Sequence, residues 1–568
     1  MMEEELKRRI TSENYVDFLV DARVNLDEVL ETFTDSIFQV LNEAVGVVYV
    51  PIEEYSIEDL GRVQFTAIPN LNGLVSIESL ESSGVFDIRE SVNFNLMGNG
   101  VLVGIIDTGI DYTNPIFKYD DGTTKIASIW DQTIDSNDRY PFNYYFGREY
   151  LREEINEALA SSDPLSIVPS TDEHGHGTML AGVAAGRDVE EEGFYGVAPA
   201  SELVVVKLRQ AKKVWRDFFV IPDDSVCYQG NHIIWGVQYC IDYARSVGRP
   251  IAICLGVGTS QEAHDGRSYL SNITTIASSF TGSAIVVAAG NEGNMGRHFS
   301  GTIEAGINNV LVELNVGDEE GFTMELWGQS PGIFSIDILT PNGEYIPRIP
   351  PFLRVHRVIS FVFEETIIYV DYHTVELDTG DQLILLRFHK PTPGLWRFNV
   401  YSRGDIESNF NIWLPMGDFI SKETFFLRPD IYTTVLAPGT AMGPITVTAY
   451  NPSNENLYIN ASRGYNRVGD IVPELAAPGV NYLVPTLSNG FGLSSGTSIS
   501  AAHTTGIAAL MLEWGIIDGN YPEINTIVIK KYLMRGARRS PALTYPNRDW
   551  GYGIIDIFNS FDILRLNI

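Results

Sequence analysis

Residues 499–512, with the sequence ISAAHTTGIAALML, are small or apolar on nearly every face apart from His503. A helix with this sequence has no polar face, so other elements must cover it on all sides. The preceding residues, 492–498, read GLSSGTS. One interpretation is that these serines only cap a structural helix. The other is that Ser498 is a nucleophile, placed where free backbone N–H groups and the helix dipole stabilise an oxyanion.

A serine nucleophile needs a base and a residue that orients the base. The apolar run GVLVGIID, residues 100–107, predicts a buried parallel strand with the Asp107 carboxylate at its C-terminal end. Further along, HGHGT places His174 and His176 before a helix of small residues. The structural alternatives are an aspartate that caps a turn and a histidine that only packs. The histidine spacing disfavours zinc, because two ligands on a helix are typically four residues apart.

A third candidate partner follows another apolar segment. SAIVVAAGN, residues 283–291, predicts a strand that breaks at Gly290 and presents Asn291. Asn-Glu-Gly is ordinary turn chemistry. An asparagine just beyond the end of a strand is also suited to donating its amide N–H to a developing oxyanion.

The four segments together are far more specific than any one of them. They occur in the order Asp, His, Asn, Ser, which matches the order of the catalytic groups in subtilisin. The blocks DTGID, HGTMLAG, AAGNEG and GTSISAAH closely resemble the four signature blocks of the subtilisin-like serine proteases, the subtilases. The resemblance extends from about residue 95 to 559, apart from one insertion. It implies a serine endopeptidase of the α/β class, with a doubly wound parallel sheet.

The resemblance also implies a role for each candidate residue. Asp107 orients and supports His176, which is the general base, while His174 is not. Ser498 attacks the substrate, and its backbone N–H forms the oxyanion hole together with Asn291.

The segment ICLGVG, residues 253–258, resembles the family's strand that pairs with the substrate backbone. The resemblance therefore implies that Cys254, Leu255 and Gly256 bind substrate. One departure from the family pattern is Ala502, where a proline is usual.

The chain is predicted to have four parts. Residues 1–75 predict strands at 14–22, 46–52 and 62–69 and a helix at 26–45. This small α+β unit resembles the subtilase propeptide, a chaperone and inhibitor whose C-terminal end lies in the active site; an unrelated N-terminal domain is the alternative. The resemblance predicts self-cleavage between about residues 66 and 79. The catalytic domain is then expected at 76–299 and 431–568.

The remaining part, residues 300–430, consists of alternating strand-like segments separated by proline, glycine and Asn-Gly turns. It predicts an inserted antiparallel β-sandwich of jelly-roll type. Whether such a sandwich binds a ligand or only braces the enzyme does not follow from its sequence.

Composition limits the possible partners. The formal net charge of −34 at pH 7 argues against binding to nucleic acid or to anionic membranes. The N-terminal sequence lacks a signal peptide's apolar core, and no apolar run reaches the roughly 18–20 residues of a membrane span. Synthesis in the cytoplasm is therefore expected. No cofactor is predicted, and calcium is left open because no acidic loop has a convincing ligand spacing.

Four further sequence segments narrow the resemblance to one group of subtilases: DTGIDYTNPIF, TKIASIWDQT, MLEWGI and TYPNRDWGYG. They resemble the Csp subtilases of spore-forming clostridia, which are packed into the spore. That resemblance implies a protein substrate, the precursor of a cortex-degrading hydrolase, which is activated by limited proteolysis at germination. Two alternatives stay open: a general intracellular processing protease, and a signalling scaffold whose prodomain holds it inactive.

Overall fold

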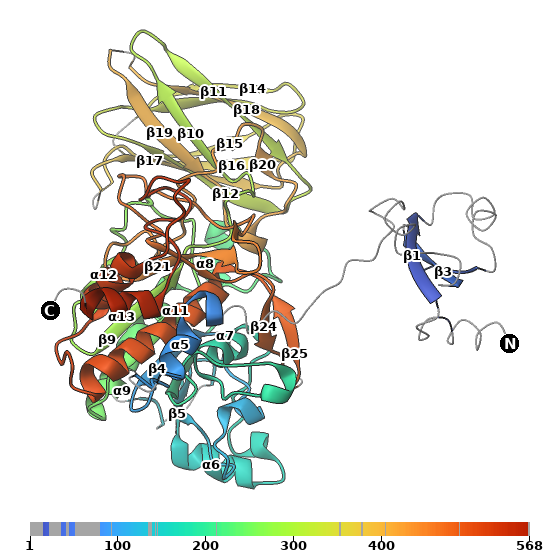
Figure 1. The fold of residues 1–568 in the computed structure, drawn as a ribbon. Helices are drawn as coiled ribbons and strands as arrows, with labels where there is room; N and C mark the ends of the chain where they lie inside the picture. Colours follow the sequence, from blue (N-terminus) through green and yellow to red (C-terminus); the bar gives the residue numbers. More distant parts are fainter. Residues whose placement is uncertain are drawn as a thin grey trace. The chain divides into compact units, whose positions relative to one another are not determined.

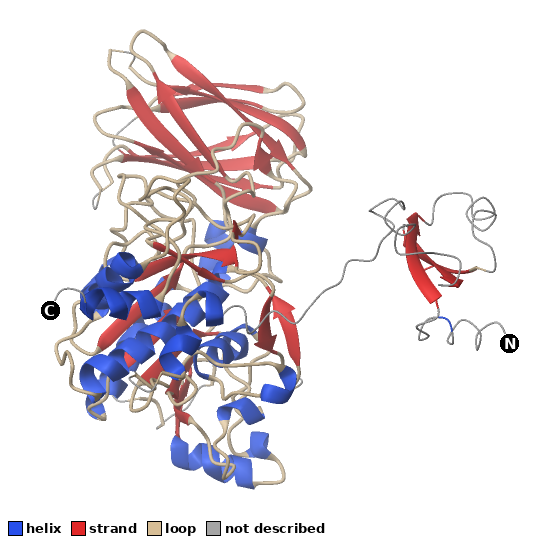
Figure 2. Cartoon of the chain, viewed as in Figure 1, coloured by secondary structure: helices blue, strands red, loops and turns tan. Residues whose placement is uncertain are grey.

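The computed structural model describes residues 9, 15–21, 36–40, 45–51, 80–91, 94–134, 139–141, 144, 146–211, 213–351, 354–376, 379–403, 405–487 and 489–565. The chain forms two compact units, Met1–Leu74 and Val75–Ile568. Each unit is described separately below, and Figures 1 and 2 show their elements.

The first unit contains a three-stranded antiparallel sheet in the order β1-β3-β2. Its strands are β1 (Tyr15–Asp21), β2 (Ile37–Val40) and β3 (Val45–Pro51). The helix predicted at 26–45 is therefore wrong over Ile37–Val40, which pairs with β3 instead. Isoleucine, phenylalanine and valine favour strands, and an available partner strand outweighs a helical apolar pattern. The rest of that helix, the strand predicted at 62–69 and the cleavage window at 66–79 lie outside the described residues.

The centre of the second unit is a mostly parallel sheet in the order β22-β21-β9-β8-β4-β7-β5-β6, with β23 paired to β21. Its strands are β4 (Leu102–Asp107), β5 (Ile126–Asp131), β6 (Arg148–Leu151), β7 (Glu202–Lys207), β8 (Ile251–Leu255), β9 (Ser283–Ala288), β21 (Ile445–Asn451), β22 (Asn456–Leu457) and β23 (Leu475–Pro478). Every residue of β4, β8 and β9 is buried, as their continuous apolar sequences predict. Only the edge strands β6 and β22 run antiparallel to their neighbours.

Helices cover both faces of this sheet (Figure 2). Alternate residues of β4 enter different cores: Val103 and Ile105 face one, and Leu102 and Ile106 face the other. The helices are α5 (Val85–Arg89), α6 (Arg152–Ala160), α7 (His176–Ala185), α8 (Lys213–Phe219), α9 (Gly230–Ser246), α10 (Tyr269–Ser278), α11 (Thr497–Leu512), α12 (Thr526–Gly536) and α13 (Ile557–Arg565). All residues of α11 except Ser498 are buried. The helix is thus enclosed on all sides, as its sequence predicts.

An antiparallel β-sandwich interrupts the second unit between β9 and β21 (Figure 1). One sheet has the order β10-β19-β12-β17-β16-β15, and the other has the order β14-β13-β18-β11-β20. The strands are β10 (His298–Ile303), β11 (Asn309–Val316), β12 (Gly321–Gly328), β13 (Ser335–Leu339), β14 (Tyr345–Ile349), β15 (Arg354–Ser360), β16 (Ile367–His373), β17 (Gln382–His389), β18 (Gly394–Tyr401), β19 (Ser408–Trp413) and β20 (Phe425–Phe426). Both sheets contribute side chains, such as Phe388 and Trp396, to one shared core.

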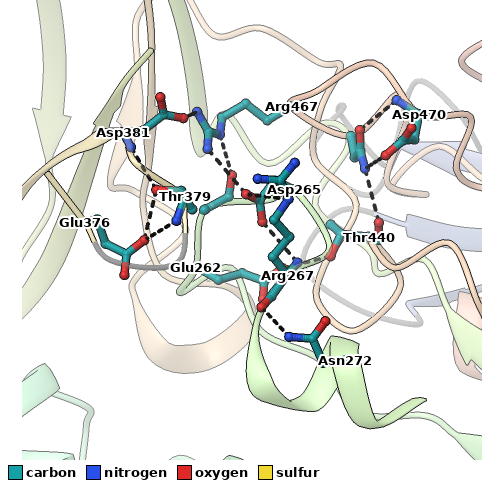
Figure 3. Close-up of polar contacts among 12 residues, drawn as sticks. Glu262, Asp265, Arg267, Asn272, Glu376, Thr379, Asp381, Thr440, Arg467 and Asp470 are labelled. Carbon is teal, nitrogen blue, oxygen red and sulfur yellow. Dashed lines mark hydrogen bonds and ion pairs between the residues drawn. The ribbon is translucent and has the colours of Figure 1, made fainter. Parts of the chain in front are cut away.

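The sandwich is joined to the α/β part by aromatic and charged contacts. The His264 ring stacks on Trp413 at the end of β19, with centroids 4.1 Å apart. Arg467 of the α/β part contacts Asp381 of the sandwich, with Nη1 and Oδ2 2.6 Å apart. Figure 3 shows Arg467 between Asp381 and Asp265, with Glu262 close by.

Two buried carboxyl groups lie in this contact region. Burial raises the pKa of Glu325 to about 7, although its hydrogen bond from Trp327 opposes the shift and nearby Glu262 adds to it. Burial likewise raises the pKa of Glu262 to about 7, against hydrogen bonds from Ser268 and Thr440. Both carboxyl groups therefore hold their protons in the folded state at pH values where the unfolded chain has lost them.

This arrangement predicts a loss of stability with rising pH. Between about pH 4.5 and 7 the unfolded chain binds fewer protons at these sites than the folded chain does, so the free energy of unfolding falls. Glu325→Gln mimics the protonated carboxyl group and should unfold with a weaker pH dependence, measured by denaturant titration at pH 5 and 8. Glu304→Gln, at an exposed position of the sandwich, is the control. Equal pH dependence in all three proteins would contradict this account.

Candidate active site

Asp107 and His176 form a close pair at the carboxyl end of the central sheet. Asp107 is the last residue of β4, and its side chain is only 1% exposed. His176 begins α7, and its Nδ1 lies 2.7 Å from Asp107 Oδ1. The backbone N–H of Thr108 donates a second hydrogen bond to the same oxygen at 2.8 Å. The carboxylate therefore holds the imidazole in one orientation and leaves Nε2 for chemistry.

A second carboxylate, which the sequence analysis did not single out, fixes the start of α7. Asp172 Oδ2 accepts hydrogen bonds from the backbone N–H and the hydroxyl of Thr178, at 2.9 and 2.8 Å. Its Oδ1 accepts from Thr108 Oγ1 at 2.8 Å and from the Gly175 N–H at 2.8 Å. Asp172 thus ties the loop after β4 to the helix that carries His176. Its sequence signal is an acidic residue four positions before the histidine.

The surroundings of His176 favour its protonated form. Burial lowers the pKa of His176, but the charge of Asp107, the hydrogen bond to it and the charge of Asp172 together outweigh burial, so the pKa is raised. The imidazole is still 35% exposed, which leaves it accessible to a substrate. A base with a raised pKa accepts a proton readily while the neighbouring carboxylate stabilises the imidazolium.

Ser498 contacts the backbone of Gly256, which lies beside the Asp107–His176 pair. It is the second residue of α11, and its Oγ donates a hydrogen bond to the Gly256 carbonyl at 3.0 Å, not to His176. Gly256 directly follows β8. A Cβ at Gly256 would lie 3.1 Å from His176 Cε1, 3.2 Å from Asp107 Oδ2 and 2.5 Å from Leu180 Cδ1. A side chain at Gly256 would crowd the Asp107–His176 pair, and the three predicted residues thus meet around the Gly256 backbone.

Asn291 lies beside the start of α11. Its Oδ1 accepts hydrogen bonds from the backbone N–H and the hydroxyl of Thr497, at 3.1 and 3.2 Å. With the oxygen held in this way, the amide Nδ2 remains as the donor group. Asn291 and Ser498 line the same small cavity of about 380 Å³. The N–H groups at the start of α11 and the Asn291 amide are therefore suited to stabilising an oxyanion there.

The predicted substrate-binding residues are divided between the core and the surface. Cys254 and Leu255 are 1% and 0% exposed and pack on opposite faces of the sheet. Gly256 instead lines the small cavity and also a larger one of about 950 Å³, which His174 and His176 border. Val257 and Gly258 line both cavities as well. They belong to the segment ICLGVG but were not selected from the sequence.

The structure predicts a measurable contribution of Asp172 to the His176 pKa. In the wild-type protein, an NMR titration should give a His176 pKa above 6.5, the ordinary value. Asp172→Asn removes one of the charges that favour the imidazolium, so the His176 pKa should fall. An unchanged pKa in this variant would contradict the electrostatic role of Asp172. His503 is an internal control, because burial lowers its pKa to about 3 and it should stay neutral.

Two kinds of site are not found in the part of the chain that the structure describes. Among these residues, no three histidine, cysteine, aspartate or glutamate side chains are grouped closely enough to hold a metal ion. None of the described helices is both long enough and apolar enough to cross a membrane.

Comparisons with known proteins agree with this geometry. The Subtilase family model matches residues 98–312 and 428–553. The solved structure of the Clostridium perfringens CspB protease is 32% identical, with a TM-score of 0.77, covering 86% of this chain and 98% of that one.

Similarity extends to curated proteins at lower identity. Subtilisin-like protease SBT3.13 of Arabidopsis thaliana is 24% identical over 452 residues, covering 76% of this chain and 56% of the relative. Pyrolysin of Pyrococcus furiosus is 22% identical over 607 residues, covering 98% of this chain and 32% of the relative. The chain thus spans about half or less of the length of these two relatives. Because the family model matches more than half of the chain, the chain belongs to the subtilase family.

Proposed function

We propose that this subtilase is an active serine endopeptidase with Asp107, His176 and Ser498 as its catalytic triad. The observation that carries the proposal is the hydrogen bond of 2.7 Å between His176 and Asp107. Ser498 donates a hydrogen bond to the carbonyl of the adjacent Gly256. Catalytic hydrogen bonds often tighten only once a substrate binds, so the bond from Ser498 to Gly256 fits a resting site.

The proposed reaction is acyl transfer in two steps. Ser498 Oγ attacks the substrate carbonyl carbon and gives its proton to His176 Nε2. The Asn291 amide and the Ser498 N–H stabilise the resulting oxyanion. His176 then donates the proton to the leaving amine, which breaks the peptide bond and leaves an acyl-enzyme. Water, deprotonated by His176, attacks this ester and releases the acid, which restores the Ser498 hydroxyl.

The substrate is a protein, and two cleavages are proposed. The first is removal of the enzyme's own propeptide, residues 1–75, which then stays bound as an inhibitor. The second is limited proteolysis of a cortex-hydrolase precursor in a germinating spore. The similarity to the Clostridium perfringens CspB protease over 86% of the chain supports this role and a spore location. The small unit Met1–Leu74 is consistent with a propeptide in size and position.

Two other functions remain as alternatives. A general intracellular processing protease would use the same site on different substrates. A signalling scaffold held inactive by its prodomain would keep the triad without using it. The His176–Asp107 contact is expected of both the active enzyme and the scaffold, and labelling of Ser498 by a fluorophosphonate separates the two.

Ser498→Ala should abolish peptide hydrolysis while the protein stays folded, because a single hydroxyl is lost from a half-buried position. We expect kcat to fall by a factor on the order of 10⁴ or more. His176→Ala should behave in the same way. His174→Ala is the matched control and should retain most activity, because among the described residues it is His176, not His174, that hydrogen-bonds Asp107. Activity of Ser498→Ala within tenfold of wild type would show that another residue is the nucleophile.

The same variant tests self-processing. Wild-type protein should begin within residues 66–79 after cleavage, as determined by N-terminal sequencing and intact mass. Ser498→Ala should remain one uncut chain. Cleavage that persists without the Ser498 hydroxyl would refute self-processing, and so would a wild-type start outside this window.

A further inference from the structure

One wall of the larger active-site cavity comes from α8 and the turn that follows it, residues 213–221. This cavity of about 950 Å³ also has His176 in its lining. Four residues of the segment line it: Trp215, Arg216, Phe219 and Ile221. Trp215 is 49% exposed, so part of its side chain is accessible to solvent. A shift of this segment would therefore change the space that a substrate chain can occupy beside His176.

Hydrogen bonds within the surrounding loop give this segment its shape. The Arg216 Nη2 group donates to the carbonyl groups of Pro222 and Ser225, at 2.6 and 3.1 Å. The Ala211 N–H donates to the Cys227 carbonyl at 2.7 Å, which closes the loop. A helix of seven residues is too short to be stable on its own, so α8 depends on tertiary contacts for its position.

The sandwich provides such a contact through Arg387 of β17. Leu386 and Phe388, on either side, are part of the sandwich core, so Arg387 faces away from that core. Its guanidinium carbon lies 4.2 Å from the centroid of the Phe218 ring in α8. Arg387 Nη2 donates to Asp371 Oδ2 at 2.9 Å, which orients the guanidinium group. The Arg387 side chain is 12% exposed, and a cation–π contact is stronger when it is shielded from water.

A second contact with the sandwich lies at the turn after α8, where the backbone is strained. Val220 has a φ of +55°, in the left-handed region that a β-branched residue rarely adopts. Such a conformation persists only where the surrounding structure imposes it. A Cβ added to Gly321, the first residue of β12, would lie 2.5 Å from Val220 Cγ1. Val220 therefore packs directly on the sandwich backbone, and the turn is strained at the point where it meets the sandwich.

We propose that the inserted sandwich holds α8 in place as a wall of the substrate cavity, with Arg387 as the positioning residue. Arg387 lines neither of the two active-site cavities, so it acts through Phe218. When this contact is lost, Val220 relaxes and the segment moves, so the cavity binds a substrate chain less well. The inference rests on the proposed endopeptidase function, since that function supplies the substrate, whereas the contact itself is testable without it.

Hydrogen–deuterium exchange tests the contact without any catalytic activity. Full-length Ser498→Ala, which should stay uncut, is the common background. Adding Arg387→Ala should speed amide exchange in residues 213–221 by about threefold or more, because the segment opens more often. Arg397→Ala is the matched control, since Arg397 pairs with Glu313 of the same sandwich sheet at 3.1 Å and its loss should leave these amides unchanged. Equal exchange in all three proteins would overturn the inference.

Peptide hydrolysis by the self-processed protein, after its propeptide has been displaced, tests the effect on substrate binding. The substrate is a quenched fluorescent peptide with the sequence of residues 66–79, TAIPNLNGLVSIES, where self-cleavage is expected. Arg387→Ala should raise KM about threefold or more and change kcat less than about twofold, because it weakens the binding of substrate and transition state alike. Arg397→Ala should match wild type in both constants. Diisopropyl fluorophosphate, a small reagent that needs only Ser498 and its activating groups, should inactivate Arg387→Ala at the wild-type rate.

Phe218→Leu tests the same contact from the other side, because leucine keeps an apolar side chain but removes the aromatic ring. It should raise KM by about as much as Arg387→Ala, and the double variant should be no worse than either single variant. Additive effects would show that Arg387 does not act through Phe218, and the inference would fail. It would fail equally if Arg387→Ala left KM unchanged. If wild type does not cleave the peptide, the self-processing endopeptidase proposed above fails, and this inference fails with it.

Discussion

The enclosure of α11 is the constraint on which the rest of the site depends. A helix without a polar face is stable only when it is covered all round, and here the covering elements include α7 and the strands β8, β9, β21 and β23. The ends of those strands and the start of α7 therefore lie around the first turn of α11. Ser498 is the one residue of α11 that is not buried. Burial of an apolar helix thus also assembles the Asp107, His176 and Asn291 side chains around one serine.

Much of the active site could be predicted from the sequence because its functional residues lie at the carboxyl ends of strands. Asp107, Gly256 and Asn291 each come directly or shortly after a continuous apolar run, and parallel strands place such residues at one edge of the sheet. The helix predicted over residues 26–45 is wrong at residues 37–40. This short apolar segment suits a helix and a strand equally, and pairing with β3 makes it a strand. Short apolar runs are ambiguous in this way.

Contacts between distant loops could not be predicted. Asp172 accepts five hydrogen bonds from backbone and threonine groups, and its sequence shows only one more acidic residue in an acidic chain. The approach of the β19–β20 connection to the active site depends on hydrogen bonds that join the Gly417 backbone to Glu292 and Arg297. The bond from Thr108 to Asp172 and the approach of the β19–β20 connection have no local sequence pattern, because each is created by tertiary packing.

Labelling with a biotinylated fluorophosphonate tests most directly whether the assembled site is an active one. The reagent reacts with a serine hydroxyl that a neighbouring base activates and an oxyanion hole supports. Incubation of the self-processed protein after its propeptide has been displaced, followed by peptide mass spectrometry, should locate the adduct on Ser498 and on no other serine. A protein that stays unlabelled, or one that carries the adduct on a different serine, would contradict the account.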